Sequence, residues 1–178
     1  MSRLPLIQPE TATGAAADLL AGVQKALGVT PNMTKAMANS PAVLKAYLDF
    51  SGALSGGALS AAVRERIALL VAQENGCDYC LSAHTYIATN IAGLDADEAD
   101  RARTGHASEP KAEAALAFAT AVVRAKGGVE DSDLKTAREA GLSDGDIAEV
   151  VAHVALNVFT NYLNKTADTD IDWPVVRH

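Results

Sequence analysis

Aromatic residues, which favour β-strands, are scarce in this sequence. Of the 178 residues, 4% are aromatic although 49% are hydrophobic, and the hydrophobic share is mainly alanine, leucine and valine. Small apolar residues with good helix propensity favour closely packed helices over a sheet. No alternating segment of useful length is found. We therefore expect one all-α domain that spans the whole chain.

Excess positive charge and long apolar runs are also missing. The formal net charge is −7, which argues against a general polyanion-binding protein because phosphate binding needs a clustered basic face. No run of about 18 apolar residues could span a membrane, and the first ten residues contain no apolar block of signal-peptide length. We expect a soluble, cytoplasmic protein that binds neither nucleic acid nor membrane.

Glycines, prolines and capping residues divide the chain into helical segments. Gly76 interrupts one helical pattern, and Ser60 and Ser143 stand where helix N-caps are expected. Residues 1–12 are expected to form an extended arm and residues 168–178 an extended tail. The helices are expected at about 14–27, 33–40, 42–54, 61–75, 77–92, 95–103, 111–126, 134–140 and 147–165.

Cysteine occurs only twice, and both copies lie in the segment NGCDYCLSAH, residues 75–84. Cys77, Cys80 and His84 fall at i, i+3 and i+7 of one expected helix and therefore on one stripe. Cys77 lies at the start of this helix, where unpaired backbone N–H groups favour a thiolate. The two sulfurs can close a disulfide across one turn, and His84 can reach Cys80 as a base. This arrangement favours thiol–disulfide chemistry.

Other interpretations of the cysteine pair are possible. A lone C-x-x-C arises by chance, and a thioredoxin-type site would follow a β-strand, which this sequence lacks. A structural zinc usually needs four protein ligands, whereas this motif offers three. A catalytic zinc of the Cys-Cys-His type stays open, although we expect no metal. In the cytoplasm a close cysteine pair is more often reactive or metal-binding than a structural crosslink.

A carboxylate near the motif could assist the histidine. Glu65 lies on the preceding expected helix and Glu74 just before the motif. Glu65 stands between Arg64 and Arg66, so a surface salt bridge is one interpretation. The alternative is that Glu65 points at the cysteine helix and orients His84 or a water in a proton relay.

A polar stripe runs along the last long helix. His153, Asn157 and Asn161 recur every four residues, and we expect this face to be buried against another subunit with its polar groups satisfied there. The alternative is a polar wall of the cysteine pocket. Aromatic residues on helical stripes are expected to belong to the core: Tyr47, Phe50, Tyr86 and Phe118.

The segment RERIALLVAQENGCDYCLSAHT resembles the core motif of the alkylhydroperoxidase D-like, peroxidase-related proteins of the carboxymuconolactone decarboxylase superfamily. That motif has a glutamate, eleven residues, Cys-x-x-Cys, three residues and a histidine, which here are Glu65, Cys77, Cys80 and His84. The resemblance extends from about Val29 to Pro174. It implies an all-α protomer that assembles into a homo-oligomer, as a dimer, trimer or hexamer.

The resemblance also implies an antioxidant peroxidase that reduces organic or hydrogen peroxides. Cys80 would attack the peroxide and become a sulfenic acid, Cys77 would resolve it to a disulfide, and an external dithiol or protein reductant would restore both thiols. His84 would take the Cys80 proton, with Glu65 relaying through water, and no bound cofactor is needed. The helix N-terminus instead favours Cys77 as the thiolate, so the two arguments differ on the nucleophile.

One position departs from the family pattern. In the best-studied branch a second histidine immediately precedes the second cysteine, whereas Tyr79 stands here. Its phenol is a poor base near neutral pH but can donate a hydrogen bond, so we expect it to line the pocket with an altered proton relay. A general thiol–disulfide oxidoreductase or a redox-sensing module would use the same cysteines.

Overall fold

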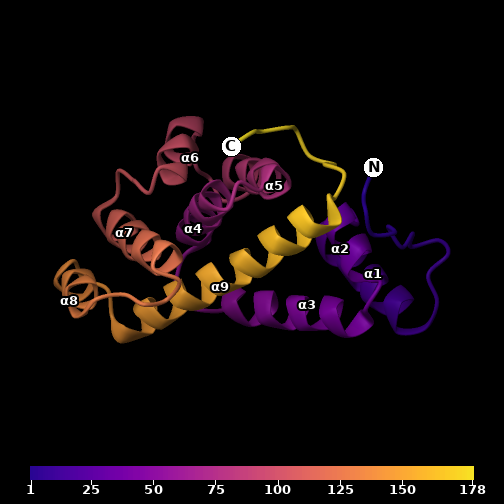
Figure 1. Ribbon diagram of the computed structural model, residues 1–178, viewed down its shortest axis with the longest axis horizontal. Helices are drawn as coiled ribbons and strands as arrows, with labels where there is room; N and C mark the ends of the chain where they lie inside the picture. Colours follow the sequence, from indigo (N-terminus) through magenta and orange to yellow (C-terminus); the bar gives the residue numbers. More distant parts are fainter.

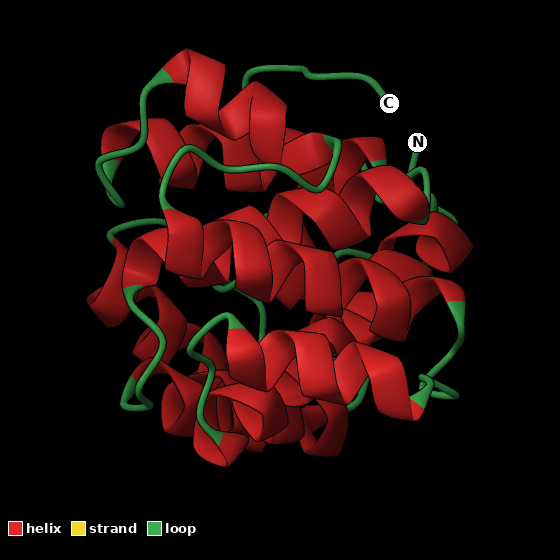
Figure 2. Cartoon of the chain, turned by 90° about the vertical axis from the view of Figure 1, so that its left-hand side faces the viewer, coloured by secondary structure: helices red, strands yellow, loops and turns green.

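The computed structural model describes residues 1–178 and is entirely helical, without any strand. This confirms the all-α prediction, and Figure 2 shows helices and connecting loops only. The helices are α1 (Gly14–Leu27), α2 (Asn32–Met37), α3 (Pro41–Ser55), α4 (Ala61–Glu74), α5 (Asp78–Asn90), α6 (Ala96–Arg103), α7 (Pro110–Arg124), α8 (Asp131–Glu139) and α9 (Asp144–Ala167).

Local signals in the sequence account for several helix boundaries. The Ser60 side chain caps α4 by accepting the Val63 N–H. Ser143 and Asp146 form a capping box at the start of α9, which satisfies two otherwise unpaired backbone donors. Gly76 adopts φ +59° between α4 and α5, a conformation that L-residues rarely adopt.

Helix α4 is the central element of the fold and packs against α5, α6, α7 and α9. Eight of its 14 residues are buried, and they include Arg66, which pairs with Glu98 of α6 at 2.8 Å. Figure 1 shows α9 running diagonally through the molecule, with α4 and α5 on one side and α3 on the other. The cysteine helix α5 thus packs against both α4 and α9.

The hydrophobic core is divided into two unequal clusters. The larger comprises 26 buried residues from α4 to α9 and the connecting loops and includes both cysteines. The smaller joins α1, α2 and α3 through Leu20, Met37, Ala38 and Leu44. The N-terminal helices therefore form a separate layer, which contacts α9 through α3.

The expectation that all four striped aromatics are core residues was wrong for two of them. Phe118 is buried, whereas Phe50 and Tyr86 are 39% and 40% exposed. Both side chains reach the surface of the protomer. Helical phase alone therefore did not distinguish a buried apolar face from an exposed one.

None of the nine helices combines the length and the apolar character that a membrane-spanning segment needs.

Candidate functional site

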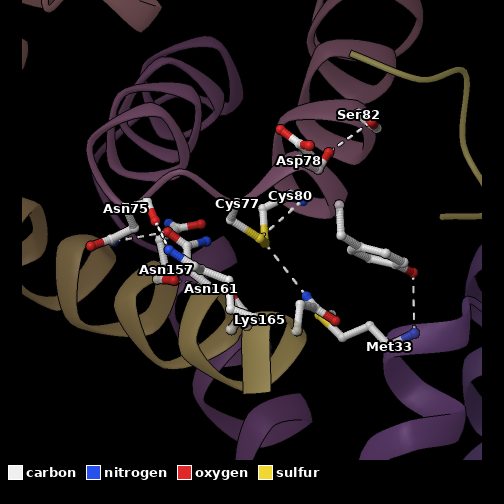
Figure 3. The surroundings of a disulfide bond; sticks show 12 residues. Met33, Asn75, Cys77, Asp78, Cys80, Ser82, Asn157, Asn161 and Lys165 are labelled. Atoms are coloured by element: carbon white, nitrogen blue, oxygen red, sulfur yellow. Dashed lines mark hydrogen bonds between the residues drawn. A yellow bond between two sulfur atoms is a disulfide. The ribbon is translucent and has the colours of Figure 1, made fainter. Parts of the chain in front are cut away.

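Cys77 and Cys80 are joined by a disulfide at the start of α5. Cys77 is the N-cap residue, and its Sγ accepts the Cys80 N–H at 3.3 Å. The two Cα atoms are 5.3 Å apart, within the usual range for disulfides. Figure 3 shows both cysteines at the end of α5 that faces α9. The cysteines are 1% and 3% exposed, so any reactant must reach sulfurs that the protein largely covers.

Glu65 and His84 form a direct pair between α4 and α5. The Nδ1 of His84 lies 2.7 Å from Oε2 of Glu65, and both side chains are about four-fifths buried, with 23% and 18% exposed. Glu65 therefore points at the cysteine helix and is not a surface salt-bridge partner of its neighbouring arginines. Because Nδ1–H donates to the carboxylate, Nε2 is the nitrogen free to exchange a proton. Glu74, by contrast, pairs with Arg124.

The stripe of His153, Asn157 and Asn161 is buried inside the protomer, which corrects the expectation that another subunit would cover it. Asn161 Oδ1 accepts a hydrogen bond from Asn75 at 2.9 Å, and Asn157 donates to the carbonyl of its own helix. Figure 3 shows both asparagines on α9, directed at the segment that leads into Cys77. Burial, together with the charge of Arg64, lowers the pKa of His153, which favours its neutral form at pH 7.

Asn164 contacts the Cys80 sulfur directly, and the sequence reasoning missed it. It follows Asn161 by three residues on α9, and its Nδ2 donates to Cys80 Sγ at 3.4 Å. The continuation of the asparagine stripe from Asn157 and Asn161 was the available signal. The surroundings of the cysteines thus include α9 as well as α4 and α5.

Tyr79 anchors neighbouring segments and does not contact the sulfurs. Its hydroxyl donates to Asp172 Oδ1 at 2.8 Å and accepts the Met33 N–H at 3.1 Å and the Trp173 indole N–H at 3.4 Å. Burial, and then the nearby Asp172 carboxylate, raise the pKa of the phenol. Tyr79 therefore joins α5 to α2 and to the C-terminal tail.

The C-terminal tail lies along α5. Ser82 exchanges two hydrogen bonds with the Val176 backbone, and Asp78 pairs with Arg177 at 2.6 Å and with His178 at 2.7 Å. Burial opposes the charge on Asp78, but the hydrogen bonds from these two residues outweigh it and lower the pKa of the carboxyl to about 2. The tail thereby covers one side of the cysteine helix.

Two surface hollows lie away from the cysteines. One, of about 160 Å³, is bordered by the N-terminal ends of α4 and α7. The other, of about 110 Å³, is lined by α7, α8 and Ala140. No three His, Cys, Asp or Glu side chains come together in positions that could hold a metal ion.

Comparisons with known proteins agree with the fold and with the family that the motif resembles. The sequence model of the carboxymuconolactone decarboxylase family matches residues 41–125, the part of the chain that contains Glu65, both cysteines and His84. No curated protein gave a match.

Solved structures match almost the whole chain. The alkylhydroperoxidase AhpD core of an uncharacterized peroxidase-related protein from Ralstonia eutropha JMP134 is 27% identical, with a TM-score of 0.85 over 96% of this chain and 92% of that one. A peroxidase-related protein from Silicibacter sp. TM1040 is 26% identical, with a TM-score of 0.79 over 95% and 91%. A variant of the debrominase Bmp8, crystallised in complex with 2,3,4-tribromopyrrole, is 22% identical, with a TM-score of 0.77 over 97% and 94%.

Proposed function

We propose that this chain is a cysteine-dependent peroxidase. Its predicted relationship to the alkylhydroperoxidase D-like proteins of the carboxymuconolactone decarboxylase family is confirmed. The observation that supports this most strongly is that the Cys77–Cys80 disulfide and His84 lie on α5 about one turn apart, and that Glu65 of α4 pairs directly with His84. The peroxidase-related neighbours support an enzyme of this type.

In the proposed cycle Cys80 is the nucleophile. His84 accepts the thiol proton through Nε2 while Glu65 holds the imidazole by its Nδ1–H. The thiolate takes the terminal oxygen of the peroxide, the O–O bond breaks, and a sulfenic acid and an alcohol or water result. Cys77 then attacks the Cys80 sulfur, water leaves and the disulfide forms. An external dithiol or protein reductant returns both cysteines to thiols.

A thiol–disulfide oxidoreductase or redox-sensing role is the second candidate. The two hollows described above do not adjoin the cysteines, and a disulfide reductase needs no dedicated peroxide pocket. The fold also occurs in a debrominase, so the fold by itself does not select the substrate.

Steady-state turnover separates these candidates. Purified protein is supplied with a dithiol, and consumption of cumene hydroperoxide and reduction of a model protein disulfide are measured side by side. A peroxidase consumes peroxide at a rate that Cys80→Ser abolishes. Reduction of the model disulfide without peroxide turnover would instead support the second candidate.

The relationship also leads us to propose that the protomer assembles into a homo-oligomer in the cytoplasm. Side chains on the outer face of α9 are apolar and exposed, among them Val151, Phe159 and Tyr162. Contiguous exposed apolar surface of this kind is typical of protein interfaces. A second copy of the chain is the occupant we expect.

A further inference from the structure

Asn164 is the only side chain of α9 that donates a hydrogen bond to a cysteine sulfur. It is 2% exposed, and its Nδ2 donates to Cys80 Sγ at 3.4 Å. Its Oδ1 is fully buried and has no hydrogen-bond partner. The Nδ2 of the carboxamide is thus hydrogen-bonded to Cys80 Sγ, and the Oδ1 of the same group has no hydrogen-bond partner.

A buried acceptor without a partner is uncommon, because most buried polar atoms are hydrogen-bonded. Asn161, one turn earlier, provides the contrast. Its Oδ1 accepts a hydrogen bond from Asn75, its buried Nδ2 has no partner, and it makes no hydrogen bond to either sulfur. The two asparagines therefore differ in the contact with Cys80. The side chain of Asn164 is fixed against Cys80 Sγ, and its Oδ1 lacks a hydrogen-bond donor. A substrate that binds beside this sulfur can supply that donor.

We propose that Asn164 is a catalytic residue that acts on Cys80 through both ends of its carboxamide, an inference that rests on the peroxidase activity proposed above. The Nδ2–H stabilises the Cys80 thiolate, because a hydrogen bond strengthens when its acceptor becomes charged. The Oδ1 accepts the hydroxyl hydrogen of the hydroperoxide and orients the terminal oxygen towards Cys80 Sγ.

The same contact persists through the oxidation step. Thiolate and ROOH give Cys80–SOH and RO⁻: the S–O bond forms, the O–O bond breaks, sulfur loses two electrons and the peroxide gains them. The hydroxyl hydrogen stays on the transferred oxygen, so Oδ1 continues to accept it in the sulfenic acid. The RO⁻ leaving group takes the proton that His84 removed from the thiol. The ligand class is therefore a hydroperoxide with a free O–H.

The test uses Cys77→Ser as the parent, since serine retains the N-cap of α5 and leaves Cys80 as the only thiol. Asn164→Leu removes donor and acceptor. Asn164→Asp keeps the shape and an acceptor but loses the N–H, and it serves if the leucine variant does not fold. Asn161→Leu is the matched control, equally buried and one turn away. The thiol pKa is read from the ultraviolet absorbance of the thiolate, and sulfenic acid formation is followed after mixing with cumene hydroperoxide.

We expect Asn164→Leu to raise the pKa of the Cys80 thiol by about one unit, the effect of losing one hydrogen bond to a charged group. Asn164→Asp should raise it further, because its carboxylate also repels the thiolate. Asn164→Leu should also form sulfenic acid about tenfold more slowly at a pH where the thiol is fully ionised. The control variant, Asn161→Leu, should match the parent in the thiol pKa and in the rate of sulfenic acid formation. Equal pKa values and rates in Asn164→Leu and Asn161→Leu would overturn the inference.

The two proposals fail in different ways. A parent that forms no sulfenic acid overturns the peroxidase and, with it, the part assigned to Oδ1. A Cys80 thiol pKa that is the same in all variants overturns the part assigned to Nδ2, even in an active enzyme.

Discussion

At the scale of single residues, the two cysteines receive different kinds of stabilisation. Cys77 Sγ accepts a backbone N–H at the helix N-terminus, whereas Cys80 Sγ accepts the Asn164 side chain. The sequence argument for a Cys77 thiolate considered only the backbone. The contact from α9 supplies Cys80 with a donor of its own, which supports the assignment of Cys80 as nucleophile.

Replacing Glu65 by glutamine is expected to slow peroxide consumption by at least about tenfold, because the charged partner of the His84 ring is lost. The measurement is the second-order rate of the reduced enzyme with peroxide. Glu74→Gln is the matched control, since Glu74 lies on the same helix and pairs with Arg124. A Glu65→Gln rate equal to that of Glu74→Gln would remove Glu65 from the mechanism.

At the scale of elements, α5 is held by segments that are distant in the sequence. Tyr79 ties it to α2 and the tail, and Asp78 ties its first turn to the chain end. Residues adjoining the cysteines thus determine how the tail packs, and we expect both sets of contacts to stabilise the fold.

Tyr79→Phe is expected to lower the free energy of unfolding by about 1–3 kcal/mol, because the partly buried Met33 N–H and Asp172 lose a partner. Peroxide consumption should stay within about twofold of wild type, since the phenol acts as an anchor. Its raised pKa keeps it protonated, so it does not act as a base. Urea unfolding checks the first result, with Tyr86→Phe, a more exposed tyrosine of the same helix, as control. A tenfold loss of activity in a stable Tyr79→Phe protein would contradict the anchoring role.

Asp78→Asn tests the contact between tail and helix by its pH dependence. The folded-state pKa, about 2, lies below the ordinary value of 3.8, so the ionised carboxylate stabilises the fold at pH values above about 4. That contribution, on the order of 1 kcal/mol, is lost as the pH falls towards 2. Urea unfolding of both proteins at several pH values should show a difference at pH 6 that vanishes near pH 2. A difference that stays constant would show that the Asp78 charge is not involved.

At the scale of the whole molecule, the helices could be predicted from the sequence better than their mutual contacts. Gly76, Ser60 and Ser143 are local signals, and each ends or begins a helix as expected. The contact of Asn164 with Cys80 and the packing of the tail on α5 join residues far apart in the chain. Helical periodicity predicts which residues share a face, but it does not predict which element covers that face. Phe50 and Tyr86 were misassigned for this reason.

Phe159→Lys is expected to reduce the assembly to smaller species, because it places a charge within the exposed apolar face of α9. Light scattering coupled to size-exclusion chromatography measures the mass. Ala26→Lys, which adds the same charge at an exposed position of α1, is the matched control. A wild-type mass equal to that of one protomer, 18.4 kDa, would contradict the proposed homo-oligomer.

The central claim is that Cys80 reacts with peroxide and Cys77 resolves the product. Each single Cys→Ser variant retains one thiol, so one equivalent of cumene hydroperoxide gives an unambiguous result. Trapping and mass spectrometry should detect a sulfenic acid in Cys77→Ser, and Cys80→Ser should keep its thiol. A sulfenic acid on Cys77 in the Cys80→Ser variant, with Cys77→Ser unreactive, would exchange the two roles and contradict the account.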